Sequence, residues 1–169
     1  EILNSVLDAG INFIDTSPDY GISEERIGKY ISSRRSEFYL ATKCGCVYTQ
    51  HEDHLEIDHV WKKDVIQRNI EASLERLQTD YVDLLQFHGG DAATLEREGL
   101  IELLMNFRDQ GIVRFIGASS SLPHLPGLID LGLGPQRGDH DRDLVLLAQL
   151  QVFLEAVIGA VDDLVDRKR

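Results

Sequence analysis

The sequence predicts an α/β protein: a partial TIM (β/α)8-type barrel with parallel strands, truncated at both ends and followed by an apolar C-terminal helix. Helical and strand-like patterns alternate over residues 1–131, which favours a parallel sheet with crossover helices. Polar reactive side chains stand at the ends of several strands, as they do in barrel enzymes. None of the strands is followed by the G-x-G-x-x-G turn of a dinucleotide-binding open sheet. An open doubly wound sheet is the alternative architecture.

Each expected element rests on a local pattern of apolar residues. Apolar positions recur at helical spacing in several segments, and Gly10 and Gly111 directly follow two of them, as glycine often does at helix ends. Helices are expected at 1–9, 23–33, 62–77, 94–110 and 124–131. Strands are expected at 11–15, 38–43, 81–87 and 113–118. Ser23 is the expected N-cap of the second helix. The polar stretch 45–61 is expected to be a long loop.

The character of the sequence changes after residue 132. We expect a barrel-like domain over 1–132, a glycine- and charge-rich linker over 133–143, and a helical segment over 144–169. Within that segment, 144–161 is almost wholly apolar and is interrupted by Glu155 and two glutamines. Its length reaches the lower limit for a membrane span, and a strand over part of it is a further alternative. We expect a helix that packs on exposed strands or mediates self-association.

Composition excludes two classes of partner. The 169 residues carry 17 Lys and Arg against 29 Asp and Glu, a net charge of −12. Nucleic acids and anionic membranes both require clustered basic residues, so neither is an expected partner. Cys44 and Cys46 have neither zinc nor thioredoxin spacing, and we expect reduced thiols in a cytoplasmic protein. Because Glu1 lies in a helical pattern and Met105 is the only methionine, we expect a fragment of a longer protein.

Four reactive residues lie at or just past the ends of three of the expected strands. Asp15, Tyr20, Lys43 and His88 occur in the texts NFIDTSPDYG, FYLATKCG and VDLLQFHGG. Because the carboxyl ends of barrel strands meet at one rim, an acid, a phenol, an amine and an imidazole would come together there. Such a set suits proton transfer to a carbonyl oxygen. Taken singly, each has a structural alternative: a turn or cap for the acid, a turn for the phenol, a solvated amine and a structural imidazole.

These residues, in this order and with these neighbours, resemble the aldo-keto reductase family over residues 1 to about 132. The matching texts are DTSPDYG (15–21), ATK (41–43), DYVDLLQFH (80–88) and GIVRFIGAS (111–119). The resemblance implies an NAD(P)H-dependent oxidoreductase with Tyr20 as general acid and with Lys43, held by Asp15, favouring the phenolate. It implies that His88 orients the substrate carbonyl and shares in proton transfer. The first and the last three strands of the family's barrel have no counterpart in this text.

The resemblance also indicates a cofactor and a substrate. It implies NADPH (NADP), with NAD as the alternative, and contacts from Asp15 and Ser119 to that cofactor. Ser120 takes the place of the family's usual asparagine, but a hydroxyl can also donate and accept hydrogen bonds. A helix N-cap role for the two serines is the alternative. Tyr48 and Trp61 lie after a barrel strand, where pockets form, so we expect them to contact a small carbonyl or sugar-like substrate.

Three histidines in the expected loop, His51, His54 and His59, suggest a metal site. We expect no metal, because the segment has no clear helix that would bring these imidazoles together.

Two other functions stay open at this point. One is a catalytically inactive reductase fragment that acts as a binding or assembly module. The other is a metal-dependent barrel hydrolase that uses these histidines.

Overall fold

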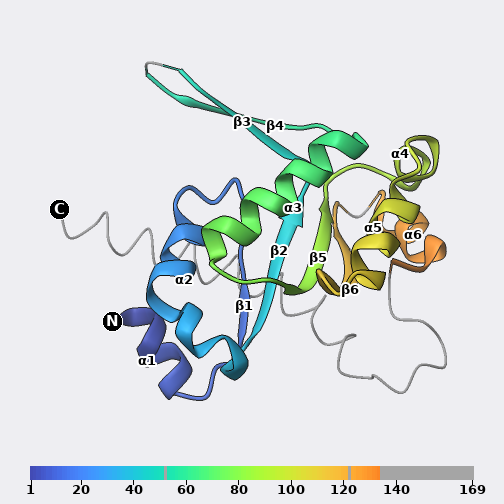
Figure 1. Ribbon diagram of the computed structural model, residues 1–169. Helices are drawn as coiled ribbons and strands as arrows, with labels where there is room; N and C mark the ends of the chain where they lie inside the picture. Colours follow the sequence, from blue (N-terminus) through green and yellow to red (C-terminus); the bar gives the residue numbers. More distant parts are fainter. Residues whose placement is uncertain (52, 122, 134–169) are drawn as a thin grey trace. The chain divides into compact units, whose positions relative to one another are not determined.

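Four parallel strands form the main sheet of the computed structural model, which describes residues 1–51, 53–121 and 123–133. The strands are β1 (Phe13–Asp15), β2 (Tyr39–Cys44), β5 (Val82–His88) and β6 (Val113–Ser119). They lie in the order β1-β2-β5-β6, and each neighbouring pair is parallel (Figure 1). The predicted α/β fold with a parallel sheet is therefore confirmed.

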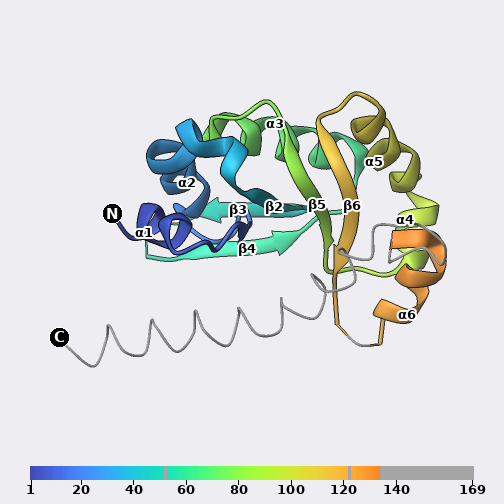
Figure 2. The same cartoon turned by 90° about the horizontal axis from the view of Figure 1, so that it is seen from below.

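Helices connect the strands and cover one face of the sheet. α1 (Ile2–Asp8) precedes β1, and α2 (Ser23–Ile31), α3 (Lys63–Leu77) and α5 (Leu100–Asp109) lie on one side of the strands (Figure 2). Shorter helical segments are η1 (Ser32–Glu37), α4 (Ala92–Arg97), α6 (Leu125–Leu128) and η2 (Ile129–Leu133). An apolar core fills the space between sheet and helices, and burial of this layer is the main force that holds them together. Its fully buried members include Ile31, Leu40, Ile66, Leu85, Phe87, Leu104 and Phe107.

The strand register gathers polar side chains on the face of the sheet that these helices leave uncovered. Lys43 lies opposite Gln86 on the neighbouring strand. Because side chains alternate along a strand and Phe87 belongs to the helix-facing core, Gln86 and His88 point to the other face. Asp15 is in register with the residue two positions before Lys43 and therefore shares this face. The sheet thus separates an apolar face from a polar one.

The segment 45–61 was expected to be a loop, and this prediction was wrong. It contains an antiparallel hairpin of β3 (Cys46–Gln50) and β4 (Leu55–His59), with Cys46 directly opposite His59 at its base. Figure 1 shows the hairpin projecting beyond the parallel strands. The charged, histidine-rich tip made the whole segment look polar. Its two strands nevertheless contain valine, tyrosine, threonine and isoleucine, which favour strands.

Two helix boundaries also differ from expectation. The helix expected at 94–110 is divided into α4 and α5 at Gly99, whose φ of 63° interrupts the helical path. Ser23 lies inside the first turn of α2 and does not cap it, since the N-cap residue is Ile22. The Ser23 hydroxyl instead accepts a hydrogen bond of 2.8 Å from Thr16 Oγ1, which ties α2 to the segment after β1.

Residues 134–169 hold nearly all of the expected linker and the whole expected apolar helix, and they lie outside the described residues. The domain boundaries and the self-association expected from the sequence therefore stay predictions. Within the described part of the chain, no helix combines the length and the apolar character needed to cross a membrane.

Candidate active site

Asp15 and Lys43 form a buried ion pair at the polar face of the sheet. Lys43 Nζ donates hydrogen bonds to Asp15 Oδ2 at 2.6 Å and to the carbonyl oxygen of Thr16 at 3.0 Å. The Lys43 side chain is fully buried, and that of Asp15 is 10% exposed. Gln86 Nε2 donates to the second carboxylate oxygen at 2.7 Å. Burying an ammonium is costly unless it is paired and hydrogen-bonded, and Asp15 provides this pairing and holds the Lys43 side chain in place.

Tyr20 brings a phenol to this ammonium from the loop between β1 and α2. The Lys43 Nζ atom lies 4.7 Å from the centroid of the Tyr20 ring, within the range of a cation–π interaction. The backbone N–H of Tyr20 donates to the carbonyl oxygen of Ser17 at 3.1 Å, which turns the chain at this point. Tyr20 is 37% exposed. The phenol is therefore open to a small molecule on one side and faces a buried positive charge on the other.

His88 ends β5 and stands at the centre of a second group of polar atoms. Its Nδ1 lies 3.2 Å from Cys46 Sγ, 3.2 Å from His59 Nε2 and 3.6 Å from Asp19 Oδ2. Burial is the main reason that the pKa of His88 is lowered to about 4; the Asp19 carboxylate acts to raise it, whereas His59 and Lys43 act in the same direction as burial. The imidazole is therefore neutral at neutral pH and can donate or accept a hydrogen bond.

The two cysteines are free, as expected, but they have different surroundings. Cys44 lies in the helix-facing core, where burial raises the pKa of its thiol. Cys46 lies at the base of the hairpin beside His88, and its Sγ is 3.6 Å from Ser17 Oγ. Burial raises the pKa of Cys46 to about 12, although the Ser17 hydrogen bond acts in the opposite direction. Both thiols are therefore protonated at neutral pH.

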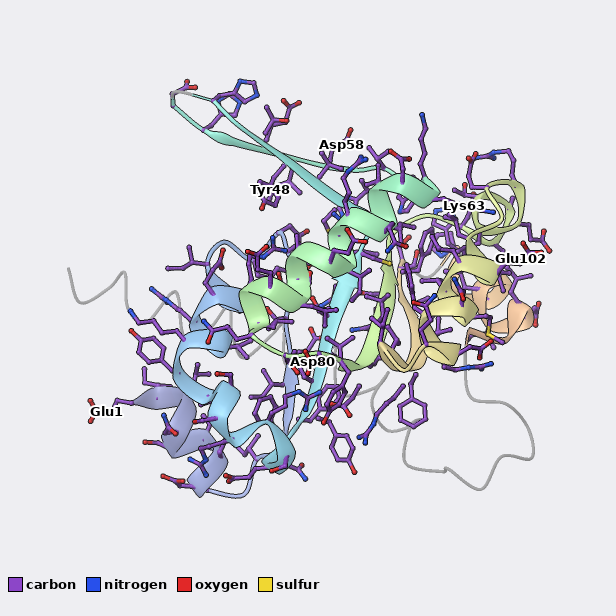
Figure 3. The ribbon with its side chains drawn as sticks, viewed as in Figure 1. Glu1, Tyr48, Asp58, Lys63, Asp80 and Glu102 are labelled. Atoms are coloured by element: carbon purple, nitrogen blue, oxygen red, sulfur yellow. The ribbon has the colours of Figure 1, made fainter. Side chains whose placement is uncertain are left out.

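The two residues expected to contact substrate lie at different depths. Trp61 is half-buried and its Nε1 donates to the carbonyl oxygen of His88 at 2.9 Å, so its indole forms a wall beside the end of β5. A Cβ at Gly45 or Gly90 would come within 2.9 or 3.1 Å of this ring, so the backbone passes close to it. Tyr48 is 48% exposed and lies on the projecting hairpin (Figure 3). Substrate contact by either residue stays a prediction.

Ser119 and Ser120 lie at the same end of the sheet. Ser119 ends β6, is the register partner of His88, and accepts a hydrogen bond of 2.7 Å from the Gly89 N–H through its carbonyl oxygen. The Ser120 hydroxyl donates to the carbonyl oxygen of Gly90 at 2.9 Å. The alternative N-cap role is not observed, because the N-cap of α6 is His124. Both serines thus lie at the rim that carries His88.

The three loop histidines do not form one cluster. His51 and His54 lie near the tip of the hairpin, where their rings stack with centroids 4.6 Å apart. His59 lies at the base of the hairpin, where its ring meets that of His88 edge to face at 4.6 Å. The sequence spacing of these histidines therefore gave no indication of which one approaches the site.

Sequence reasoning missed three residues of the site. Gln86 had a usable signal, because it precedes His88 by two residues on a strand and so shares its face. The sequence signal for Asp19 and Cys46 was weaker. Each lies close to an expected site residue in the chain, but their approach to His88 depends on loop and hairpin geometry that local patterns do not encode.

The fold and the site together define a class of protein. A parallel α/β sheet carries an acid, an amine, a phenol and an imidazole near the carboxyl ends of its strands, which is where (β/α)8 barrels place their active sites. Comparison with known proteins identifies the family. The model of the aldo/keto reductase family matches residues 1–124, and the chain belongs to this family.

Relatives and solved structures agree with this assignment. The chain is 36% identical over 128 residues to the uncharacterized oxidoreductase YqkF of Bacillus subtilis, a match that covers 73% of this chain and 40% of that protein. It is 36% identical over 115 residues to L-galactose dehydrogenase of Arabidopsis thaliana, covering 64% of this chain and 34% of that protein. The holo form of aldo-keto reductase AKR11C1 from Bacillus halodurans matches with a TM-score of 0.63 and 37% identity, over 70% of this chain and 40% of that one.

The matched region accounts for the fold. The sheet described above resembles part of the TIM barrel of aldo-keto reductases. The chain spans 40% or less of the length of each of these three proteins.

Proposed function

We propose that this chain carries the proton-transfer site of an NAD(P)H-dependent oxidoreductase that interconverts an aldehyde or ketone and an alcohol. One observation carries the proposal: a fully buried ammonium, fixed by a carboxylate at 2.6 Å, lies 4.7 Å from the ring centroid of a partly exposed phenol. Lys43, Asp15 and Tyr20 supply these three groups. Membership in the aldo/keto reductase family supports the same chemistry.

In this proposal Tyr20 donates the proton. Its Oη transfers a proton to the carbonyl oxygen as that oxygen gains negative charge, and the phenolate left behind is stabilised by the ammonium of Lys43. Asp15 does not meet the substrate in this scheme. It holds Lys43 through a charged hydrogen bond. In the reverse direction the phenolate accepts the proton of the alcohol.

His88 orients the carbonyl. Because its imidazole is neutral at neutral pH, it can donate one hydrogen bond to the carbonyl oxygen without bringing a second cation to the buried Lys43. Trp61 supports His88 from the side through the hydrogen bond to its backbone carbonyl at 2.9 Å. These contacts fix the direction from which a substrate oxygen approaches Tyr20.

The residues at the end of β6 fit the nicotinamide end of the expected cofactor. Ser119 lies next to His88 across the sheet, and Ser120 follows it with a hydroxyl already directed at the neighbouring backbone. Such hydroxyls and the Asp15 carboxylate can accept hydrogen bonds from a carboxamide and from a ribose. When bound, NADPH or NADH supplies the hydride that reduces the carbonyl carbon. We propose NADPH as the preferred form.

The substrate in this proposal is a small carbonyl compound or a sugar. L-galactose dehydrogenase, 36% identical over 115 residues, acts on a sugar by its name. The alternative of a non-catalytic assembly module is not favoured, because the acid, amine, phenol and imidazole expected from the sequence all lie at one end of the sheet. A cytoplasmic location stays a prediction.

The test compares Tyr20→Phe with the wild-type chain. NADPH consumption is followed with a panel of small aldehydes, ketones and aldoses, and cofactor binding is measured separately by fluorescence. We expect Tyr20→Phe to lower kcat at least about 100-fold, the lower range for loss of a general acid, with cofactor affinity unchanged. Tyr30→Phe, at a tyrosine that is also half exposed, is the matched control. Equal rates in the two variants would refute the role of Tyr20.

A further inference from the structure

Four potential metal ligands converge beside the proposed proton-transfer site. Asp19, Cys46, His59 and His88 each offer one donor atom, and all four atoms lie within 4.8 Å of one another. The four residues come from three separate parts of the fold: the loop after β1, the base of the β3–β4 hairpin, and the end of β5. Of the three histidines that suggested a metal site in the sequence, His51, His54 and His59, only His59 belongs to this set.

Hydrogen bonds cannot satisfy this cluster. His88 Nδ1 lies within 3.6 Å of a sulfur, a nitrogen and an oxygen, but a ring nitrogen has a single hydrogen-bonding position, either one N–H or one lone pair. At most one of the three contacts can therefore be a good hydrogen bond with that atom. A cation at the centre would instead receive one lone pair from every member.

The spacing of the donor atoms fits tetrahedral Zn²⁺. Zinc–nitrogen bonds of about 2.0 Å and a zinc–sulfur bond of about 2.3 Å place tetrahedral ligand atoms roughly 3.3–3.6 Å apart. Of the six separations, His88 lies 3.2 Å from Cys46, 3.2 Å from His59 and 3.6 Å from Asp19, and His59 lies 3.9 Å from Asp19. The other two, from Cys46 to His59 and to Asp19, are within 4.8 Å. Small shifts of these side chains would complete the coordination.

Asp19 contributes a buried carboxylate that hydrogen bonds do not fully satisfy. Its side chain is 9% exposed, and among the described residues its Oδ1 is buried without a hydrogen-bond partner. A buried carboxylate oxygen without a partner is costly.

The charges also balance, because one thiolate and one carboxylate neutralise Zn²⁺ while both imidazoles stay neutral. The adjacent Lys43–Asp15 pair adds no net charge.

The surrounding structure holds the ligands in position. Cys46 and His59 are direct cross-strand partners, so the hairpin presents them as a pair. Asn69 on α3 fixes the hairpin base by donating to the Cys46 carbonyl at 2.9 Å and accepting from the Gly45 N–H at 2.8 Å. Trp61 binds the carbonyl of His88. Such outer contacts are typical of protein metal sites.

We propose that Asp19, Cys46, His59 and His88 bind one Zn²⁺ ion. The mixture of sulfur, nitrogen and a single oxygen favours zinc over magnesium or calcium, which prefer oxygen ligands. On binding, Cys46 releases its thiol proton to solvent and Zn²⁺ releases its coordinated water. Four protein ligands leave no open position, so the ion is structural or inhibitory and not catalytic. Because it occupies His88, Zn²⁺ inhibits the reductase activity; this consequence, unlike the binding itself, rests on the proposed function.

The test uses the full 169-residue chain after removal of metals with a chelator. Zn²⁺ binding is titrated in competition with a chromophoric chelator, and Co²⁺ replaces Zn²⁺ for absorption spectroscopy. We expect one ion per chain, the visible bands of tetrahedral Co²⁺ and a thiolate-to-cobalt charge-transfer band. Cys46→Ser removes the charge-transfer band, and Cys46→Ser and His59→Asn each weaken Zn²⁺ binding at least about tenfold.

Two matched variants separate this site from its alternatives. Cys44→Ala removes the other cysteine, and His54→Asn removes a histidine at the hairpin tip; both retain binding if the site is correct. Circular dichroism of each variant verifies the fold. The proposal is overturned if the wild-type chain binds no Zn²⁺, or if His54→Asn weakens binding as much as His59→Asn. These readouts need no enzymatic activity, so a chain without turnover refutes the proposed function and leaves the zinc site to be judged separately.

Discussion

Removal of the negative charge of Asp15 should strongly destabilise the fold, whether or not the chain is an enzyme. In Asp15→Asn the ammonium of Lys43 loses its counter-ion and stays in a fully buried position. Its remaining anchor is the carbonyl oxygen of Thr16 at 3.0 Å. The substituted amide keeps a single acceptor oxygen, so it can accept from Gln86 or from Lys43 but not from both. The perturbation therefore removes the counter-charge of one buried cation together with one hydrogen bond.

The geometry sets the expected magnitude. The bond from Lys43 to Asp15 is 2.6 Å long, and the two side chains are 0% and 10% exposed, so solvent screens the pair only weakly. Loss of one partner of a buried pair costs about 3–5 kcal/mol. A domain of this kind has a total unfolding free energy of about 5–15 kcal/mol. We therefore expect Asp15→Asn to remove a large fraction of the stability of the chain.

A double variant makes the prediction specific. Lys43→Met removes the cation and leaves the carboxylate, which keeps its hydrogen bond from Gln86 at 2.7 Å. When both changes are combined, no buried charge is left, so the double variant should be more stable than Asp15→Asn alone. Coupling between contacting residues is about 0.5–3 kcal/mol, and we expect the upper end of this range for a pair with so little exposure.

Urea unfolding followed by circular dichroism measures all three variants at neutral pH. Asp64→Asn is the control, because the Asp64–Arg68 pair on α3 also joins opposite charges, at 3.0 Å, with side chains 65% and 67% exposed. This exposed pair should contribute no more than about 0.5 kcal/mol. If the effects of Asp15→Asn and Lys43→Met add within about 0.5 kcal/mol, the two groups do not interact and the reasoning is refuted.

Two further changes probe the packing of the scaffold in the same assay. In Gly28→Ala the new Cβ would lie 2.1 Å from the carbonyl oxygen of Arg76, so α2 and α3 must move apart; we expect a loss of about 1–3 kcal/mol. Arg26→Ala, an exposed change in the same helix, should have little effect, and equal stability of the two variants would contradict the close helix contact. Asp83→Asn leaves the largely buried Arg35 without its carboxylate partner, and we expect a loss of about 3 kcal/mol; an unchanged unfolding midpoint would show that this pair is not stabilising.

The alternation of helices and strands could be predicted because each element has its own apolar period. The hairpin could not, since its strands flank a charged tip and each is only five residues long. The division at Gly99 was also missed, because apolar residues occur on both sides of the break and a single glycine inside a helical pattern is often tolerated. Periodicity reports which residues are buried, and it is insensitive to a single glycine that changes the backbone direction.

The site shows a similar limit. Asp15, Lys43 and His88 could be predicted because strand-end position alone brings them to one end of a parallel sheet. Cys46 and Asp19 reach His88 only through the way the hairpin and the loop after β1 fold back over the strand ends. Contacts that depend on loop geometry leave no periodic trace in the sequence, so local patterns identified the residues of the proposed proton-transfer site and missed Cys46 and Asp19 beside His88.

The proposed zinc site and the proposed proton-transfer site meet at His88 and in the loop after β1, which carries both Asp19 and Tyr20, whereas the hairpin contributes only to the zinc site. Asp15 and Lys43 lie on β1 and β2, whereas Cys46 and His59 belong to the base of the hairpin. A change at the hairpin pair therefore removes zinc ligands without altering the buried ammonium or the phenol beside it. Zn²⁺ bound at Nδ1 would fix the imidazole of His88, so we expect it to interfere with the proposed orientation of a carbonyl by this residue. His59→Asn should then relieve inhibition by zinc.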